Sequence, residues 1–216
     1  MDYKIIYEPG EGEIVEKKSR FIGIIRSVEN EEQALAFIAA KKKQYWNATH
    51  NCWAYVIGKN QEIVRCSDDG EPSGTAGKPM LDVLLKEEIH NAVVVVTRYF
   101  GGTLLGTGGL VRAYQQGVKA ALDNAVVVKK LPGVKGKVTT DYNGIGKIQY
   151  IMRTMEVLEM ASEYTDIVTV DFMIPVEKYQ SFVDKVTEGT NGKAEITKLA
   201  EMYYGDALGE CVLFEE

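Results

Sequence analysis

The sequence contains few of the features that mark secreted, membrane-spanning or zinc-binding proteins. Its start, MDYKIIYEPG, has no basic segment followed by an apolar one, so we expect no signal peptide. The longest apolar runs, such as residues 92–96, fall far short of the roughly 20 residues that cross a bilayer. The three cysteines, Cys52, Cys66 and Cys211, form no CxxC motif. These absences predict a reduced, cytoplasmic protein with no membrane segment and no zinc ribbon.

Catalytic motifs are also scarce. The chain has two histidines and contains neither HExxH nor GxSxG. His50 and Cys52 are two residues apart on a predicted strand and share one of its faces, but parallel side chains are poorly aligned for proton transfer. A catalytic triad or a zinc site is therefore the weaker hypothesis. The sequence favours a protein without catalysis, cofactor or resident metal.

The charge is unevenly divided along the chain. The net charge of −6 argues against a protein that coats nucleic acid without specificity. Residues 1–132 carry 17 Lys and Arg against 16 Asp and Glu, whereas residues 133–216 carry 8 against 15. We therefore expect a polyanion to approach the first part and to avoid much of the second.

The 216 residues, of which 45% are hydrophobic, suit one large globular domain or two small ones. Residues 131–136, LPGVKG, follow a strand-like run and are the one stretch typical of a linker. We therefore predict one domain at residues 1–132 and another at residues 133–216.

The first part has the pattern of an α+β domain. Asn30 has the position of an N-cap, and Gln33 would complete a capping box. The run 91–100 is apolar at nearly every position, as expected of a strand covered on both faces. The predicted strands are 20–28, 49–57, 62–66, 91–100 and 125–130, and the predicted helices lie around 30–43, 79–88 and 108–123.

The second part has a more regular pattern. Strands are predicted at 134–142, near 158–164, at 167–174 and at 194–203. One helix follows the first strand, with Ile145, Ile148 and Met152 on one face, and another begins at Pro175. The order βαββαβ is that of the ferredoxin-like split unit.

Residues 68–79, DDGEPSGTAGKP, predict an exposed, sharply turning loop. Glycines let backbone N–H groups turn toward an anion, and hydroxyls and a lysine add further donors. The Walker A pattern fails because positions 72 and 79 are both Pro. The acidic side chains are suited either to Mg²⁺ or to capping a plain turn. The candidate binding residues of this loop are Asp68, Asp69, Glu71, Ser73, Thr75 and Lys78.

Residues 98–114, RYFGGTLLGTGGLVRAY, predict a strand, a glycine loop and a helix N-terminus. This arrangement presents free N–H groups and the positive end of a helix dipole to an anion. The dinucleotide fingerprint fails because position 111 is Val. The alternative is close packing of helix on strand, where only glycine fits. The candidates here are Arg98, Tyr99, Gly101, Gly102, Gly106, Gly108, Gly109 and Arg112. We expect both loops to wall one polar cleft.

THNCWAY at residues 49–55 precedes these two segments, and in order and spacing the three resemble the YigZ/IMPACT family over roughly residues 1–130. The remainder resembles the accessory C-terminal domain of the bacterial members. The resemblance implies a first domain with the fold of the second domain of a small-subunit ribosomal protein, also found in domain IV of elongation factor G and in the GHMP small-molecule kinases. It implies a second domain similar to the ferredoxin-like C-terminal domain of elongation factor G.

The resemblance also bears on function. Eukaryotic relatives act in translational control by binding a regulator of an initiation-factor kinase, and they have an additional N-terminal domain that this chain lacks. The leading hypothesis is a translation-linked factor that binds RNA or a ribosome-associated protein through the two glycine-rich loops, without catalysis. One alternative is an enzyme acting on a small phosphorylated or peptide substrate, with Asp68, Asp69 and Lys78 as the suspected side chains. The other is a protein-docking module.

Overall fold

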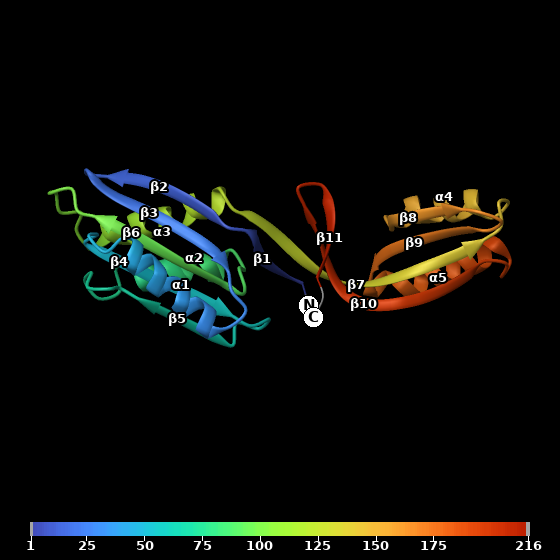
Figure 1. Ribbon diagram of the computed structural model, residues 1–216, viewed down its shortest axis with the longest axis horizontal. Coiled ribbons are helices and arrows are strands. Elements are labelled where there is room, and N and C mark those ends of the chain that lie inside the picture. The colour runs from blue at the N-terminus through green and yellow to red at the C-terminus, as the bar shows by residue number, and fades with distance from the viewer. Residues whose placement is uncertain (1, 215–216) are drawn as a thin grey trace. The chain divides into compact units, whose positions relative to one another are not determined.

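The computed structural model describes residues 2–214 as an α+β protein with five helices (Figure 1). The described chain divides into two compact units. The large unit holds residues 3–129 and 206–210, and the small unit holds residue 2, residues 130–205 and residues 211–214. Among the described helices none is both long and apolar enough to cross a bilayer.

The large unit is built on an antiparallel sheet in the order β2-β3-β6-β4-β5. Its elements are β1 (Tyr3–Glu8), β2 (Gly10–Glu16), β3 (Ser19–Ser27), α1 (Glu31–Gln44), β4 (His50–Ile57), β5 (Ile63–Ser67), α2 (Gly77–Lys86), β6 (Ala92–Tyr99) and α3 (Thr107–Asp123). β6 lies in the middle of the sheet, and residues 92–98 are all buried, which confirms the prediction of a strand covered on both faces.

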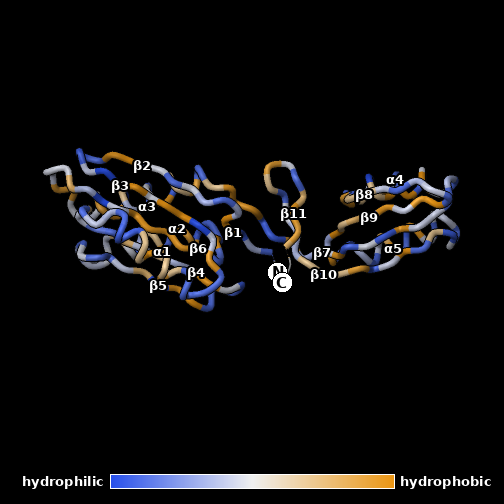
Figure 2. Tube along the Cα trace, viewed as in Figure 1, coloured by the Kyte–Doolittle hydropathy of each residue, from blue (hydrophilic) through white to orange (hydrophobic). Residues whose placement is uncertain are grey.

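Helices cover both faces of this sheet. α2 and α3 pack on one face, around Phe21, Met80 and Tyr114. α1 packs on the other face, mainly against β4 and β6, and buries Ile38 against Val95 and its neighbours. The middle of the sheet is accordingly the most hydrophobic part of the unit (Figure 2).

The start of α1 has the predicted N-cap, but the reciprocal bond expected of a capping box is made to the residue before the cap. The Asn30 side chain accepts a hydrogen bond from the backbone N–H of Gln33 at 2.9 Å, which confirms the N-cap. The Gln33 side chain accepts in return from the N–H of Glu29, one residue before the cap. Both ends of the entry turn are therefore hydrogen-bonded.

The small unit has the predicted element order βαββαβ. Its elements are β7 (Val126–Thr140), α4 (Ile145–Met155), β8 (Leu158–Tyr164), β9 (Val168–Pro175), α5 (Val176–Thr190), β10 (Glu195–Ala207) and β11 (Glu210–Phe214). The strands are ordered β11-β10-β7-β9-β8, and β1 also pairs with β7, whose first four residues belong to the large unit. Phe172 and Phe182 meet edge to face in the core beneath α4 and α5.

The prediction of a linker at residues 131–136 was wrong, because this segment lies inside β7. Pro132 lies opposite Tyr203 in the ladder with β10 and precedes Gly133, where the ladder with β9 begins. A Cβ on Gly136 would lie 2.4 Å from the ring of Phe172. Gly136 is therefore needed in β7 to make room for the ring of Phe172. In the sequence alone, a proline followed by two glycines is typical of a turn, which is why the strand was mistaken for a linker.

We expect residues 1–132 to fold without residues 133–216, because the large unit has a sheet and a hydrophobic core of its own. The purified fragment should unfold on heating in one cooperative transition, measured by circular dichroism. A second fragment, which ends at residue 129, tests whether residues 130–132 of β7 are needed for folding. A gradual loss of signal from both fragments would contradict an independent first domain.

Candidate functional site

The two glycine-rich loops leave the sheet of the large unit at the same end. β5 and β6 are both antiparallel to β4, so they run in the same direction. Residues 68–76 follow β5 and lead to α2, and residues 100–106 follow β6 and lead to α3. The turn at residues 17–18 and the segment 45–49 lie at this end too, since β3 and β4 begin opposite the end of β6. We call these four segments the loop end.

A buried ion pair joins the first glycine-rich loop to the base of the second. Arg98 Nη1 lies 2.6 Å from Glu71 Oε1, and the two side chains are only 6% and 3% exposed. Tyr114 on α3 donates its hydroxyl to the same carboxylate oxygen at 2.7 Å. His50 Nε2 lies 3.8 Å from Glu71 Oε2, and Arg98 Nη2 donates to Ser19 Oγ at 3.4 Å. Glu71 therefore connects β4, β6 and α3 beneath the loops.

The first loop is folded around the carboxylate of Asp68. This carboxylate accepts hydrogen bonds from the backbone N–H groups of Gly74 at 2.8 Å, Ala76 at 3.0 Å and Gly77 at 2.8 Å. Partial burial acts to raise the pKa of Asp68, but the three donors outweigh it and hold that pKa below its usual value. The N–H groups that we expected to receive an external anion are therefore occupied by Asp68, which also caps α2.

Two further polar side chains of this loop have internal partners as well. Asp69 pairs with Lys42 of α1 and accepts from the backbone N–H of Asn51 at 2.7 Å. Thr75 donates its hydroxyl to the carbonyl of Pro72 at 2.6 Å. In residues 2–214 no three His, Cys, Asp or Glu side chains are grouped to hold a metal ion. The acidic residues that were suited to Mg²⁺ face protein donors instead.

These contacts support neither an enzyme built on Asp68, Asp69 and Lys78 nor a nucleophile at Cys52. Lys78 pairs with Asp82 one turn along α2, at 2.7 Å, and Asp68 and Asp69 are held as described. Cys52 is fully buried, and its Sγ lies 2.9 Å from the carbonyl oxygen of Asp68. Burial raises the pKa of the Cys52 thiol far above its usual range, so a thiolate nucleophile is not available there.

The second loop is the more open of the two. Gly102 and Gly106 adopt positive φ angles of 83° and 74°, and a Cβ at either position would meet no atom within 4 Å. α3 begins after Gly106 without a side-chain cap. Its first backbone N–H groups are therefore not capped by a side chain, and they lie at the positive end of the helix dipole. Arg112 is exposed one turn into the helix and lines a small hollow of about 90 Å³ together with Lys17.

Three exposed apolar side chains at the loop end were not among the predicted site residues. Trp46 and Leu104 are each 81% exposed, and Phe100 is 46% exposed. The segments that carry them lie side by side, because the N–H of Phe100 donates to Thr49 Oγ1 at 3.1 Å and Tyr99 Oη donates to Asn47 Oδ1 at 3.0 Å. The available sequence signal was a tryptophan within the polar stretch QYWNATH.

The predicted site residues differ in how far their polar groups are engaged. Those held by contacts across the loop end are Asp68, Asp69, Glu71, Thr75, Arg98 and Gly101, whose N–H donates to Ser19 Oγ. Lys78 and Tyr99 each have one polar partner and are wholly or partly exposed. The remaining candidates are also wholly or partly exposed: Ser73, Gly102, Gly106, Gly108, Gly109 and Arg112. We expected the Arg98 guanidinium to meet a phosphate, but the end of β6 turns it inward onto Glu71. The loops emerge at the same end, as expected, and are linked there by a buried ion pair.

Known proteins are similar to this chain over nearly its whole length. Residues 17–122 match the model of the Impact N-terminal domain, and residues 138–193 match a domain of unknown function (DUF1949). The IMPACT family member YvyE of Bacillus subtilis (strain 168) is 45% identical over 203 residues, which cover 94% of this chain and 93% of YvyE. YigZ of Escherichia coli (strain K12) is 34% identical over 187 residues, covering 86% of this chain and 92% of YigZ.

A solved structure described as that of a hypothetical protein is also similar. It superposes with a TM-score of 0.58 at 32% sequence identity, over 92% of this chain and 98% of its own. The similarity therefore extends through both units in sequence and in fold. On this evidence the chain belongs to the IMPACT family.

Proposed function

We propose that this protein is a translation-linked regulatory factor without catalysis, and that its loop end binds single-stranded RNA. Family membership supports the link to translation, since the resemblance implies translational control for the eukaryotic members. Cys52 and Cys66 carry free thiols in the described chain, which is compatible with action in the cytoplasm.

The proposal includes the folds of the two domains, residues 1–132 and residues 133–216. For the first we propose the fold of the second domain of a small-subunit ribosomal protein, as in domain IV of elongation factor G. For the second we propose a ferredoxin-like fold. The antiparallel order β10-β7-β9-β8, with α4 and α5 packed on a common core, supports the second assignment.

The observation that carries the RNA hypothesis is the combination of exposed aromatic rings with cations at the loop end. Bases stack on exposed aromatic side chains, at about 1–3 kcal/mol per base, whatever their sequence. Trp46 and Phe100 offer such rings, and the uncapped N-terminus of α3 with Arg112 offers donors and positive charge to a phosphate. Residues 133–216 carry 8 Lys and Arg against 15 Asp and Glu, and this negative charge would repel the RNA from the small unit.

Arg112 provides the test of phosphate contact. Binding of a labelled single-stranded oligoribonucleotide is measured by fluorescence anisotropy over a range of salt concentrations. Each neutralised phosphate contributes about −0.7 to the slope of log K against log[salt], so Arg112→Ala should flatten the slope by about that amount. The matched control is Lys119→Ala, which removes an exposed cation two turns further along α3 and should leave the slope nearly unchanged. No binding at low salt, or equal effects of the two substitutions, would contradict RNA binding at the loop end.

A second candidate is protein docking, favoured by Leu104 at 81% exposure and by Val15 at 62%. Apolar side chains so exposed on a loop and a strand end suit a partner with an apolar surface, such as a ribosome-associated protein. Sedimentation with purified ribosomes distinguishes the two, because an apolar contact survives high salt and a phosphate contact does not. Leu104→Glu should abolish salt-resistant sedimentation if docking is the function.

A further inference from the structure

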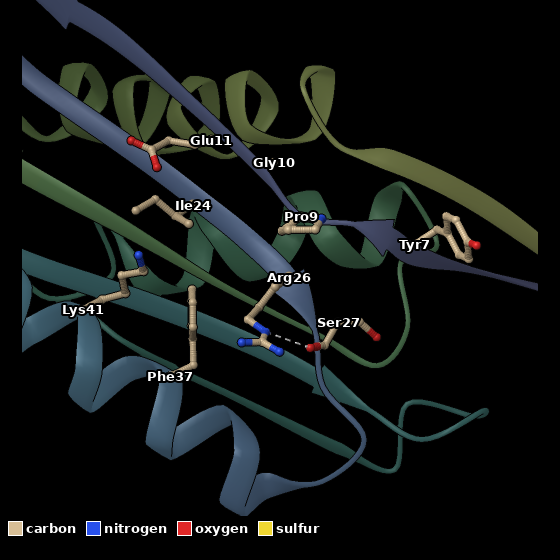
Figure 3. Close-up of a pocket in the computed structure, with 9 residues that line it drawn as sticks. All are labelled: Tyr7, Pro9, Gly10, Glu11, Ile24, Arg26, Ser27, Phe37 and Lys41. Carbon is tan, nitrogen blue, oxygen red and sulfur yellow. Dashed lines mark hydrogen bonds between the residues drawn. The ribbon is translucent and has the colours of Figure 1, made fainter. Parts of the chain in front are cut away.

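The large unit has a hollow of about 580 Å³ on the face of its sheet opposite α2 and α3 (Figure 3). It exists because α1 packs mainly against β4 and β6, which leaves β2 and β3 less covered on this face. The volume lies within the range of about 300–1,000 Å³ that is typical of small-molecule sites. The lining side chains come from β1, β2, β3 and α1.

The inner surface of this hollow is apolar. Ile24 of β3 is 6% exposed, and the ring of Phe37 projects from α1 toward it and packs against the core on this face (Figure 3). An aromatic ring placed here would therefore exchange water for contact with an isoleucine and a phenylalanine.

Two cations flank the Phe37 ring. The Arg26 guanidinium lies 5.7 Å and the Lys41 ammonium 5.5 Å from the ring centroid, and Figure 3 shows the ring between them. Arg26 Nε donates to the carbonyl of Ser27 at 3.3 Å, and Lys41 Nζ donates to Gln44 Oε1 at 2.9 Å. Within residues 2–214 neither cation forms an ion pair with a carboxylate, so most of their N–H donors remain available to an anion.

One acidic side chain lines the opposite wall. Glu11 on β2 is paired across the ladder with Ile24 on β3. It would repel an anionic group on its own side and accept hydrogen bonds from N–H groups there. The hollow thus has an apolar floor, a basic wall and a single acceptor carboxylate.

We propose that this hollow binds a nucleoside monophosphate, with the phosphate on Arg26 and Lys41, the base against Ile24 and Phe37, and the donor edge of the base toward Glu11. Arginine and lysine both suit phosphate, and the base supplies the flat apolar body. A carboxylate can accept two parallel N–H donors, which the edge of guanine offers and that of adenine does not. Guanosine 5′-monophosphate is therefore the ligand expected to bind best.

Isothermal titration calorimetry of the full chain with guanosine 5′-monophosphate tests the proposal. We expect one site per chain and at least about tenfold weaker binding of guanosine, which lacks the phosphate, and of ribose 5-phosphate, which lacks the base. Arg26→Gln and Lys41→Ala should each weaken binding by about tenfold or more, because each removes charge-assisted hydrogen bonds. Glu11→Gln should abolish the preference for guanosine over adenosine 5′-monophosphate.

Lys43→Ala is the matched control, since Lys43 is exposed two residues further along α1 and does not line the hollow. It should leave the affinity unchanged, as should Arg112→Ala at the loop end. Absence of binding at millimolar nucleotide would overturn the proposal, as would equal effects of Lys41→Ala and Lys43→Ala. Loss of binding in Arg112→Ala alone would place the nucleotide at the loop end and would also overturn it.

Discussion

Replacement of Glu71 by Ala should lower the free energy of unfolding by about 3–5 kcal/mol, because it leaves a buried charge without its partner. Arg98 is 6% exposed, and its Nε already has no hydrogen-bond partner in the described structure. The Tyr114 hydroxyl would lose its acceptor as well. The free energy is measured by urea denaturation at neutral pH, and Arg98→Ala should give a loss of similar size.

Two comparisons make this prediction specific. Glu71→Gln keeps an oxygen acceptor for Arg98 and Tyr114 and should cost less than Glu71→Ala. The exposed pair of Arg20 with Glu13, at 2.8 Å and with 52% and 39% of the side chains exposed, provides the control. Arg20→Ala should change stability far less, since exposed ion pairs are solvated and screened. If Glu71→Ala were no more destabilising than Arg20→Ala, the buried pair would not hold the loop end together.

Replacement of Asp68 by Ala should lower the free energy of unfolding by about 2–4 kcal/mol, since three backbone N–H groups lose their acceptor. Ala76 and Gly77 are buried, so water cannot easily replace the carboxylate at their N–H groups. Asp68→Asn keeps one oxygen acceptor and should cost less. The exposed Ser73 lies in the same loop, and Ser73→Ala is the matched control, with little expected effect.

The contribution of Asp68 should also depend on pH. Its pKa in the folded protein lies below the usual value, so the carboxylate stabilises the fold at every pH above its unfolded pKa of about 3.9. This stabilisation is lost as the pH falls through the folded pKa. The difference in stability between the wild type and Asp68→Asn should therefore shrink below about pH 4. A difference that stays constant between pH 7 and pH 3 would contradict the N–H cage around Asp68.

Much of the fold could be predicted from the sequence, where pattern and structure coincide. The apolar run of β6 and the N-cap at Asn30 are local signals, and both are confirmed. β1 and β2 were not predicted. Gly10 and Gly12 are typical of a turn, but a Cβ on Gly12 would lie 2.3 Å from the carbonyl oxygen of Ala120, because α3 crosses β2 closely. That requirement comes from a helix more than 100 residues away in the chain and leaves no local signal.

The contacts of the candidate site also depend on the three-dimensional path of the chain, so the sequence could indicate only part of them. The sequence indicates that the first loop gathers backbone N–H donors, and it does, but their acceptor is the carboxylate of Asp68 in the same loop. Which acceptor reaches the donors depends on the turns between them. The inward direction of Arg98 likewise depends on Glu71, which composition and spacing cannot place beneath it. The residue type alone favours a buried position for Trp46, since tryptophan is usually found largely buried, whereas this one is 81% exposed.

The proposed stacking of RNA bases at the loop end is tested most directly by the fluorescence of Trp46. The chain has two tryptophans, and Trp53 is partly buried against Tyr55, with ring centroids 5.5 Å apart. Trp53→Phe therefore leaves Trp46 as the sole reporter. Addition of a single-stranded oligoribonucleotide should quench this emission saturably, and added salt should reverse the quenching. The Trp46→Phe protein, which retains only Trp53, should show no quenching. Unchanged Trp46 emission at RNA concentrations that saturate the anisotropy signal would contradict stacking at the loop end.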